Sequence, residues 1–470
     1  MRNKKRRMEF FSFYNHTSIT AHLEKMALKG WMLDEIRNTT WIYRRIEPQK
    51  LHFAVSYYPK ASAYDPEPAP EQQDFWDFCA HTGWILACTS AQMQIFYNEQ
   101  EKPVPIDTDP ELEVETIHEA AWKSYFPGQI VLLAMGLIIL FVNLMIFYGN
   151  PIAYLSNPAQ CFGAICWLVV IFMIAMELVA YGRWHGKAEE AAENGIFLDT
   201  VNTTPIQLSG LAVVGTGAVY LVLSYILPGD TMMQYLLGAM TVYLFVLFPL
   251  VGAVSRLLKR WKAPRKVNQV ITGLVSFGMS FLMLYTVILS TLMLKQEGYF
   301  EKGNVETYEH MGMTWELRKD EIPLKLEDFM DVDAEIYSYE CRGDTSLVVS
   351  DETMTQVPRY DVQDRINLPE LRYRVVEVKL PFLYDMCRRQ MVKDLTQAAA
   401  MHEIPYEYRD KLEPVDAAPW GAEEAYYVVN DYNSWESNRF YLCYEDSFVD
   451  ITFDWTVTEE QKAIVASVFK

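Results

Sequence analysis

The sequence lacks the short motifs that mark the common catalytic and cofactor-binding classes. It has no GxxxxGK[ST] phosphate loop, no HExxH pair, no CxxC pair and no GxSxG elbow. Its eight histidines show no metal-ligand spacing. Three of its seven cysteines follow residue 294, which excludes a full disulfide framework there and leaves one bridge open. We therefore expect a non-enzymatic protein with no cofactor and no metal.

Basic charge is also scarce. The 470 residues carry 41 Lys and Arg against 61 Asp and Glu, a net charge of −20. A general nucleic-acid binder needs a basic face, so we expect no nucleic-acid partner. The acidity is concentrated after residue 294, where 19 basic residues stand against 37 acidic ones. The densest patch contains Asp331 and Asp333. Because the spacing and the glycine of an EF-hand are missing, the patch favours a solvated acidic face over a calcium site.

What the sequence does contain is long uncharged stretches. Hydrophobic residues make up 51% of the chain, and many gather in five segments: 127–148, 160–181, 208–227, 232–254 and 268–294. Each is close to the ~20 residues that a helix needs to cross a ~30 Å hydrocarbon layer. None shows the polar stripe of a helix on a soluble core. The pattern predicts a polytopic membrane protein with a block of five transmembrane helices over 127–294 and the lipid bilayer as a partner.

The charges of the connections predict the topology. The connections 149–159 and 228–231 have no Lys or Arg, whereas 182–207 carries two and 254–267 carries six. Lys and Arg prefer the cytoplasmic side of a membrane. We therefore expect a multi-pass protein of the cell membrane with a cytoplasmic N-terminus. With five crossings, everything after Leu294 is expected to be extracytoplasmic.

Glu177 is the one acid or base within the five stretches. One interpretation is a carboxylate that reaches the membrane interface and pairs with Arg183. The other is an intramembrane proton or cation site, as a transport protein would need. A second ionisable group in the stretches would favour transport, and the sequence has none there. We therefore favour the interfacial pair.

Residues 1–126 are predicted to form a cytoplasmic α+β domain of two β-α-β-β units. The first has a strand at Glu9–Tyr14, a helix that ends at Gly30, and strands at Met32–Arg37 and Thr40–Ile46 around a turn at Asn38-Thr39. The second has a strand at Leu51–Tyr58, a helix around Phe75–Cys79, and strands at Ile85–Ser90 and Met93–Tyr97. We expect one sheet with both helices on the same face.

The first unit also carries a resemblance. Residues 23–31 (LEKMALKGW), followed by residues 41–45 (WIYRR), are similar to the domain-of-unknown-function 2812 family, over about residues 1–100. The resemblance implies a bacterial membrane protein, because members are found mainly in Firmicutes, commonly as a cytoplasmic module ahead of membrane helices. It implies no established chemistry and supplies no catalytic residues.

Each unit contains a Gly-Trp pair, Gly30-Trp31 and Gly83-Trp84. The glycine is expected to end the helix in the left-handed conformation. We expect Trp31 and Trp84 to cover the seam between helix and sheet. The functional alternative is an aromatic docking surface for a peptide or a protein partner, and the sequence alone does not separate the two.

Residues 295–470 are predicted to form an acidic extracytoplasmic α+β domain. The expected strands are Ala334–Cys341 and Ser346–Ser350 around a turn at Arg342-Gly343-Asp344, then Tyr373–Lys379, Ala425–Asn430, Arg439–Tyr444 and Phe448–Asp454. A helix is expected from Pro381 to about Met401. Thr458 and Gln461 have the spacing of a capping box, which predicts a last helix.

The whole pattern favours a multi-domain membrane protein that joins an outer domain to a cytoplasmic module. We expect a signalling role, as a sensor or scaffold with protein partners. The alternative is a transport protein or the membrane subunit of an exporter.

Overall fold

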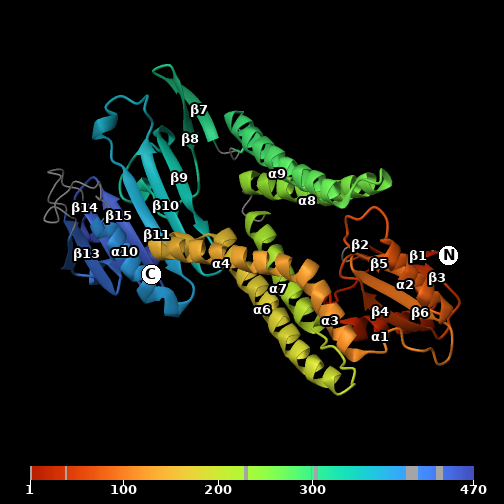
Figure 1. Cartoon of the computed structure of the whole chain (residues 1–470). Helices are drawn as coiled ribbons and strands as arrows, with labels where there is room; N and C mark the ends of the chain where they lie inside the picture. The colour runs from red at the N-terminus through yellow and green to blue at the C-terminus, as the bar shows by residue number, and fades with distance from the viewer. Residues whose placement is uncertain are drawn as a thin grey trace. The chain divides into compact units, whose positions relative to one another are not determined.

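The structure is a computed structural model that describes residues 3–37, 40–226, 231–297, 299–300, 305–397, 411–429 and 438–470 (Figure 1). The chain divides into two compact units. Unit 1 comprises Met1–Leu140, Ile165–Val219 and Met233–Met293, and unit 2 comprises Phe141–Ala164, Tyr220–Met232 and Leu294–Lys470. The turn expected at Asn38-Thr39 lies outside the described residues. The predicted division at residues 126 and 294 stays a prediction.

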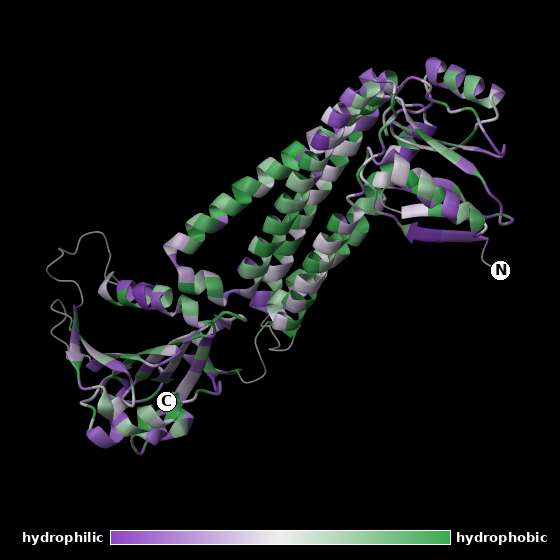
Figure 2. Ribbon diagram, turned by 90° about the horizontal axis from the view of Figure 1, so that it is seen from below, coloured by the Kyte–Doolittle hydropathy of each residue, from purple (hydrophilic) through white to green (hydrophobic). Residues whose placement is uncertain are grey.

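Five helices in the described part of the chain are long and apolar enough to cross a membrane. Their apolar runs lie in α4 (Phe126–Gly149), α6 (Pro158–Glu193), α7 (Thr204–Ile226), α8 (Thr231–Arg260) and α9 (Arg265–Gln296). Hydrophobic residues dominate the middle of these helices (Figure 2). The five apolar helices that the sequence predicts are therefore confirmed.

The N-terminal part of unit 1 has two three-stranded antiparallel sheets. Their strands are β1 (Lys4–Met8), β2 (Trp31–Arg37), β3 (Thr40–Arg45), β4 (His52–Tyr57), β5 (Ile85–Ser90) and β6 (Met93–Asn98). The strand orders are β1-β3-β2 and β4-β6-β5. In each sheet the last two strands in sequence form a hairpin, and the first strand pairs with the second strand of that hairpin. The predicted repeat is visible in detail: both hairpins have a bulge, after Leu33 and after Leu86, at positions 53 residues apart.

The expectation of one sheet with both helices on one face is wrong. Phe53, Val55 and Tyr57 of β4 share a core with α1 (His16–Leu28). Ala54 of the same strand packs in a separate core with Cys79 of α2 (Pro70–His81). Successive strand residues point to opposite faces, so the two helices lie on opposite faces of β4-β6-β5. The reason is that β4 is largely buried on both faces, and each face has a helix as its cover.

The predicted strand at Glu9–Tyr14 is also wrong, because the first strand is Lys4–Met8. In residues 9–14 two backbone carbonyls accept from side chains, and those of Ser12 and Tyr14 accept from the amides of Asn15 and His16 in local turns. The hydroxyl of Thr204 donates to the carbonyl of Phe10 at 2.9 Å, and that of Tyr57 donates to the carbonyl of Phe13 at 2.5 Å. The aromatic residues of this segment are consecutive rather than alternating, which does not fit a two-residue strand period.

A π-helical turn joins α3 (Pro110–Ala120) to α4. It covers Ala121–Tyr125, and the amide of Phe126 donates to the carbonyl of Ala121, five residues earlier. Pro127 has no amide hydrogen, and in a regular helix its ring would meet the carbonyl of Lys123. The wider π-helical turn avoids this clash, since helices commonly accommodate a proline by an irregular turn of this kind.

Unit 2 is built on a seven-stranded antiparallel sheet of order β12-β13-β14-β15-β11-β10-β9. The strands are β9 (Tyr337–Thr345), β10 (Val349–Pro358), β11 (Leu371–Val378), β12 (Lys411–Val415), β13 (Glu424–Val429), β14 (Asn438–Cys443) and β15 (Ser447–Phe453), with a separate hairpin of β7 (Val305–His310) and β8 (Met313–Arg318). On one face, α10 (Tyr384–Gln397) and α5 (Pro151–Ser156) pack on Val349 and Val376. On the other, α11 (Glu459–Phe469) contributes Val465 to a core with Tyr373 and Ile451.

Two predictions for this domain have clear outcomes. The capping box is confirmed: Thr458 accepts from the amide of Gln461, whose side chain accepts from the amide of Thr458. The turn at Arg342-Gly343-Asp344 is wrong, because these residues continue β9 to Thr345. The chain turns at Ser346, whose amide and hydroxyl bond to Val349. The helix expected from Pro381 begins as a 3-10 turn and is α-helical to Gln397; its expected end near Met401 lies outside the described residues.

Candidate functional site

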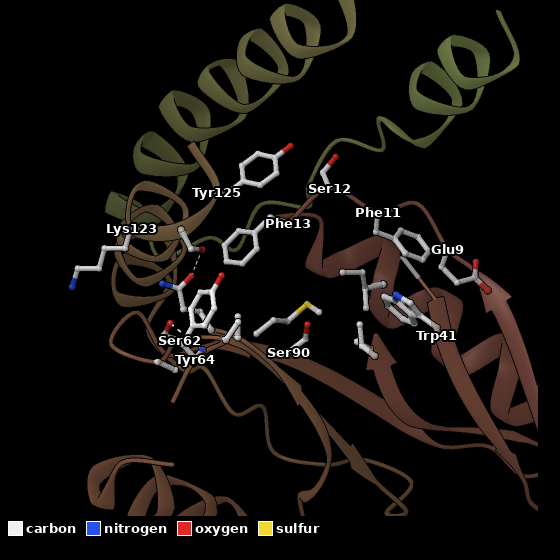
Figure 3. A pocket seen from close by; sticks show the side chains of 18 of the residues that line it. Glu9, Phe11, Ser12, Phe13, Trp41, Ser62, Tyr64, Ser90, Lys123 and Tyr125 are labelled. Carbon is white, nitrogen blue, oxygen red and sulfur yellow. Dashed lines mark hydrogen bonds between the residues drawn. The ribbon is translucent and has the colours of Figure 1, made fainter. Parts of the chain in front are cut away.

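A cavity of about 630 Å³ lies within unit 1, where the sheets meet the ends of several apolar helices (Figure 3). It is lined by residues 9–13, 61–64, 90–93 and 123–125, by Ile19 of α1, Ile36 of β2 and Trp41 of β3, by Gln207 of α7, and by Arg265 and Gln269 of α9. The side chains include the rings of Phe11, Phe13 and Tyr125. Since the lining comes from the sheets, from α1 and from the starts of three apolar helices, a bound molecule would contact parts of the fold that are far apart in sequence.

Two irregular backbone segments face this cavity. One is the π-helical turn with Lys123, Ser124 and Tyr125. The other is the tip of the β5–β6 hairpin, where Ala91 has a left-handed φ of 51°. The segments are bonded to each other, because the Ser124 hydroxyl donates to Oε1 of Gln92. Nε2 of Gln92 donates to the carbonyl of Pro59 at 3.2 Å. Such costly conformations gather at functional sites, which makes this cavity the candidate site.

A hydrogen-bonded chain leads from the cavity to Glu177. Nε2 of Gln207 lies 3.1 Å from the Ser12 hydroxyl and 3.5 Å from Oε2 of Glu177. The Ser12 hydroxyl is also 2.5 Å from that of Thr203. Glu177 is only 6% exposed, whereas Arg183 is exposed. The expected interfacial pair of Glu177 with Arg183 is therefore wrong: the carboxylate is buried and bonds to Gln207 of the neighbouring helix.

The two Gly-Trp pairs share a backbone conformation but differ in their surroundings. Gly30 and Gly83 both have positive φ, 77° and 86°, which confirms the predicted helix ends. Trp84 is 4% exposed, and its indole N–H donates to the carbonyl of Val104 at 2.7 Å. Trp31 is half-buried, with Nζ of Lys5 and Cζ of Arg45 at 5.3 and 5.0 Å from its ring centroid. Trp84 is thus a core residue, and the face of Trp31 is taken by cations of its own sheet.

The acidic patch of unit 2 is dispersed. Asp331 is exposed, and Asp333 is exposed and caps a short 3-10 helix by accepting from the amide of Glu335 at 3.1 Å. The neighbouring Glu327 accepts from Nε2 of Gln356 at 2.9 Å and from the Tyr339 hydroxyl. Within the described ranges, no group of three or more His, Cys, Asp or Glu side chains is placed to hold a metal ion.

A second cavity of unit 1, about 380 Å³, contains titratable groups that the sequence does not single out. His16, His52, Asp107 and Glu113 line it together with Trp84. Burial raises the pKa of Asp107 to about 6 and lowers the pKa of His16. Nε2 of His16 is 3.4 Å from Oε1 of Glu113. Asp107 follows a proline-rich linker, where the sequence has no helical or strand periodicity. Its burial therefore could not be predicted from the sequence.

We expect Asp107→Asn to stabilise unit 1 at neutral pH. The Asp107 carboxyl binds its proton more tightly in the folded than in the unfolded protein, because its pKa is raised to about 6. Its contribution to stability is therefore greatest below about pH 4 and is lost as the pH rises through about 6. The variant should gain about 2 kcal/mol at pH 7.5 and nothing at pH 4. Thermal unfolding across this pH range measures the difference. Asp74→Asn, at an exposed position, should show no gain; an equal gain for both variants would contradict the prediction.

Comparison with known proteins identifies one segment. Residues 16–127 match the family model described as Protein of unknown function (DUF2812), which confirms the resemblance for the segment from α1 to the start of α4. No curated protein and no solved structure matches the chain.

Proposed function

We propose that this is a non-enzymatic membrane protein that transmits the state of its C-terminal domain to its N-terminal sheet domain. The observation that carries the proposal is α6, a continuous helix of 36 residues. The C-terminal part of α6 is buried in a hydrophobic core of unit 1. Its N-terminus directly follows α5, which belongs to a core of unit 2. We propose that α6 carries displacement from one domain to the other.

In unit 1, the end of α6 is part of the sheet domain itself. Tyr181, Trp184 and Ala188 are buried in the same core as Tyr14 and Ile117. The connection that follows α6 is tied to the same domain. The hydroxyl of Thr200 donates to Oδ1 of Asn15 at 2.8 Å, and its amide donates to the hydroxyl of Thr17 at 3.2 Å. Movement of α6 would therefore act on the start of α1.

In unit 2, the connection before α6 is part of the C-terminal domain. Ile152 of α5 is fully buried in the core beneath α10. The Ser346 hydroxyl donates to the carbonyl of Leu155 at 2.6 Å. Asn157 accepts from the amide of Gln160 at 3.1 Å and donates to Oδ2 of Asp344 at 3.0 Å. One side chain thus caps α6 and contacts β9, which supports a direct path from the sheet to the helix.

The sidedness forms part of the proposal. The basic connections 182–207 and 254–267 belong to unit 1 with the N-terminal domain, for which we propose a cytoplasmic location. The uncharged connection 149–159 belongs to unit 2 with the C-terminal domain, for which we propose the outer side. A transport role has less support, because Glu177 is the one acid or base within the five apolar stretches of the sequence.

The test perturbs unit 2 and measures unit 1. A Cβ at Gly343 of β9 would lie 2.0 Å from the carbonyl oxygen of Asp351, so Gly343→Ala must displace β9 from β10. We expect amide exchange in the full chain in nanodiscs to become at least about five-fold faster in β9 and to change measurably in α1 and β4, since 1 kcal/mol corresponds to about a five-fold population change. Exposed Asp331→Asn is the control. Faster exchange in β9 with unchanged α1 and β4 would refute coupling.

A further inference from the structure

We propose that the 380 Å³ cavity of unit 1 binds an extended peptide segment with a basic side chain, which adds as a strand to the outer edge of β4. The occupant is a segment of a protein partner. The proposal concerns unit 1 alone. It goes beyond transmission between the two domains and does not depend on it.

The first argument is the backbone of β4, which is an edge strand. In the order β4-β6-β5 it pairs with β6 on one side. The amide of Tyr58, directly after the strand, donates to the carbonyl of Gln92 at 2.8 Å, and this pair continues the β4–β6 register. Bonded and non-bonded pairs alternate along an antiparallel ladder. The even-numbered residues of β4 therefore bond to β6, whereas Phe53 and Val55 direct their amide and carbonyl groups outward.

These outward groups lie at the cavity and are unpaired. Phe53 and Val55 line it and are only 5% and 7% exposed. Within the described part of the chain, no residue forms a hydrogen bond with the outward backbone groups of either one. The linker in the same lining contributes Pro103 and Pro105, which have no amide hydrogen to donate. Because buried backbone groups are nearly always hydrogen-bonded, this edge is suited to accept a further strand.

The second argument is the charge of the lining. Asp107 and Glu113 contribute carboxyl groups, and none of the described lining residues is Lys or Arg. Burial raises the pKa of Asp107 to about 6, with no cation to oppose the effect. Glu113 lies 3.4 Å from His16, whose pKa burial lowers, so that the imidazole is uncharged at neutral pH. A ligand therefore meets two carboxylates without a counter-charge, which an ammonium or guanidinium group would supply.

The third argument identifies a peptide rather than a metal ion or a free amine. Pro105 and Phe197 are exposed lining residues and Ile106 is half-buried, so the rim is apolar. The side chains of an extended segment can pack there, whereas a hydrated ion would leave the rim without a contact. A free amine would neutralise the carboxylates but leave the backbone of Phe53 and Val55 unpaired.

The test titrates the full-length chain, in nanodiscs of phosphatidylcholine, with fluorescent acetylated pentapeptides of sequence TVXVT in which X is lysine, arginine or glutamate. We expect saturable binding of the two basic peptides and at least about ten-fold weaker binding of the glutamate peptide, whose carboxylate would meet two others. Bound lysine peptide should slow amide exchange at Phe53 and Val55 but not at Ala54 and Ser56, because only the outward amides gain partners. A fully N-methylated lysine peptide cannot donate to the edge and should lose binding.

The double variant D107N/E113Q should bind the lysine peptide at least about ten-fold more weakly. The matched control is E71Q/D74N, which removes two exposed carboxylates of α2 that do not line the cavity, and it should bind as the native chain does. Equal losses in both double variants would overturn the cavity in favour of general charge attraction.

Two further outcomes would contradict the proposal. Native affinity for the N-methylated peptide, or full displacement by millimolar n-butylamine, would overturn strand addition in favour of an amine pocket. Failure of both basic peptides to bind would overturn a basic segment as the occupant. None of these outcomes bears on the exchange experiment with Gly343→Ala, so the two proposals fail separately.

Discussion

Replacing Ile152 by Ala is expected to destabilise unit 2 by about 2–5 kcal/mol, the usual cost of truncating a buried Ile. Ile152 lies in a short connection between two apolar helices, yet its side chain is fully buried. Its neighbours in the core are Val349 of β10, Val376 of β11 and Met391 of α10. The cavity left by the truncation would weaken the packing between sheet and helix. Amide exchange of β10 and α10 in the full chain measures the loss.

The control for this prediction is the next residue in the chain. Ala153 is exposed, so Ala153→Ser changes the same connection without removing a core contact. We expect unchanged exchange in β10 and α10 for this variant. If Ile152→Ala leaves the exchange of both elements unchanged, the connection is a simple link between membrane helices, and the argument for a fixed end of α6 loses its basis.

Features that depend on local composition could be predicted from the sequence. The five apolar helices follow from their length and lack of charge, and the start of α11 follows from the spacing of Thr458 and Gln461. The errors arise where tertiary contacts determine the local structure. The Arg342-Gly343-Asp344 turn was wrong because pairing with β10 keeps these residues extended. The insertion of Ile152 into a distant core has no local signal.

The candidate site was not predicted because its parts are separate in sequence. Ser12, Gln92, Ser124 and Gln207 are common residue types, and they converge only when two sheets and three helices are assembled. One local signal was available. Pro127 stands within a continuous helical pattern, and a proline in that position predicts an irregular turn before it. Trp31 and Trp84 show the converse: the same motif has different exposure, because Trp84 is buried in a core with Cys79 and Phe96, whereas Trp31 is only partly buried against the core of the other sheet.

Replacing Trp184 by Ala is expected to destabilise unit 1 by about 3–5 kcal/mol. Trp184 follows the apolar run of α6 and is 2% exposed. Its ring is stacked on Tyr14, with the centroids 5.6 Å apart and the planes at 29°. The loss should be visible as faster amide exchange in α1 and β4. Trp184→Phe keeps most of the ring volume, so its cost should be clearly smaller.

The result separates two roles that a tryptophan at this position of a membrane helix can have. As an interfacial anchor it would hold the helix at its depth in the bilayer, and its removal would change insertion but not the stability of the sheet domain. As a core residue it fixes α6 to that domain, and its removal would leave insertion unchanged. Exposed Lys187→Ala, one turn away, controls for the change in the helix surface. Altered insertion with native exchange in α1 and β4 would show an anchor and would remove the unit 1 end of the proposed path.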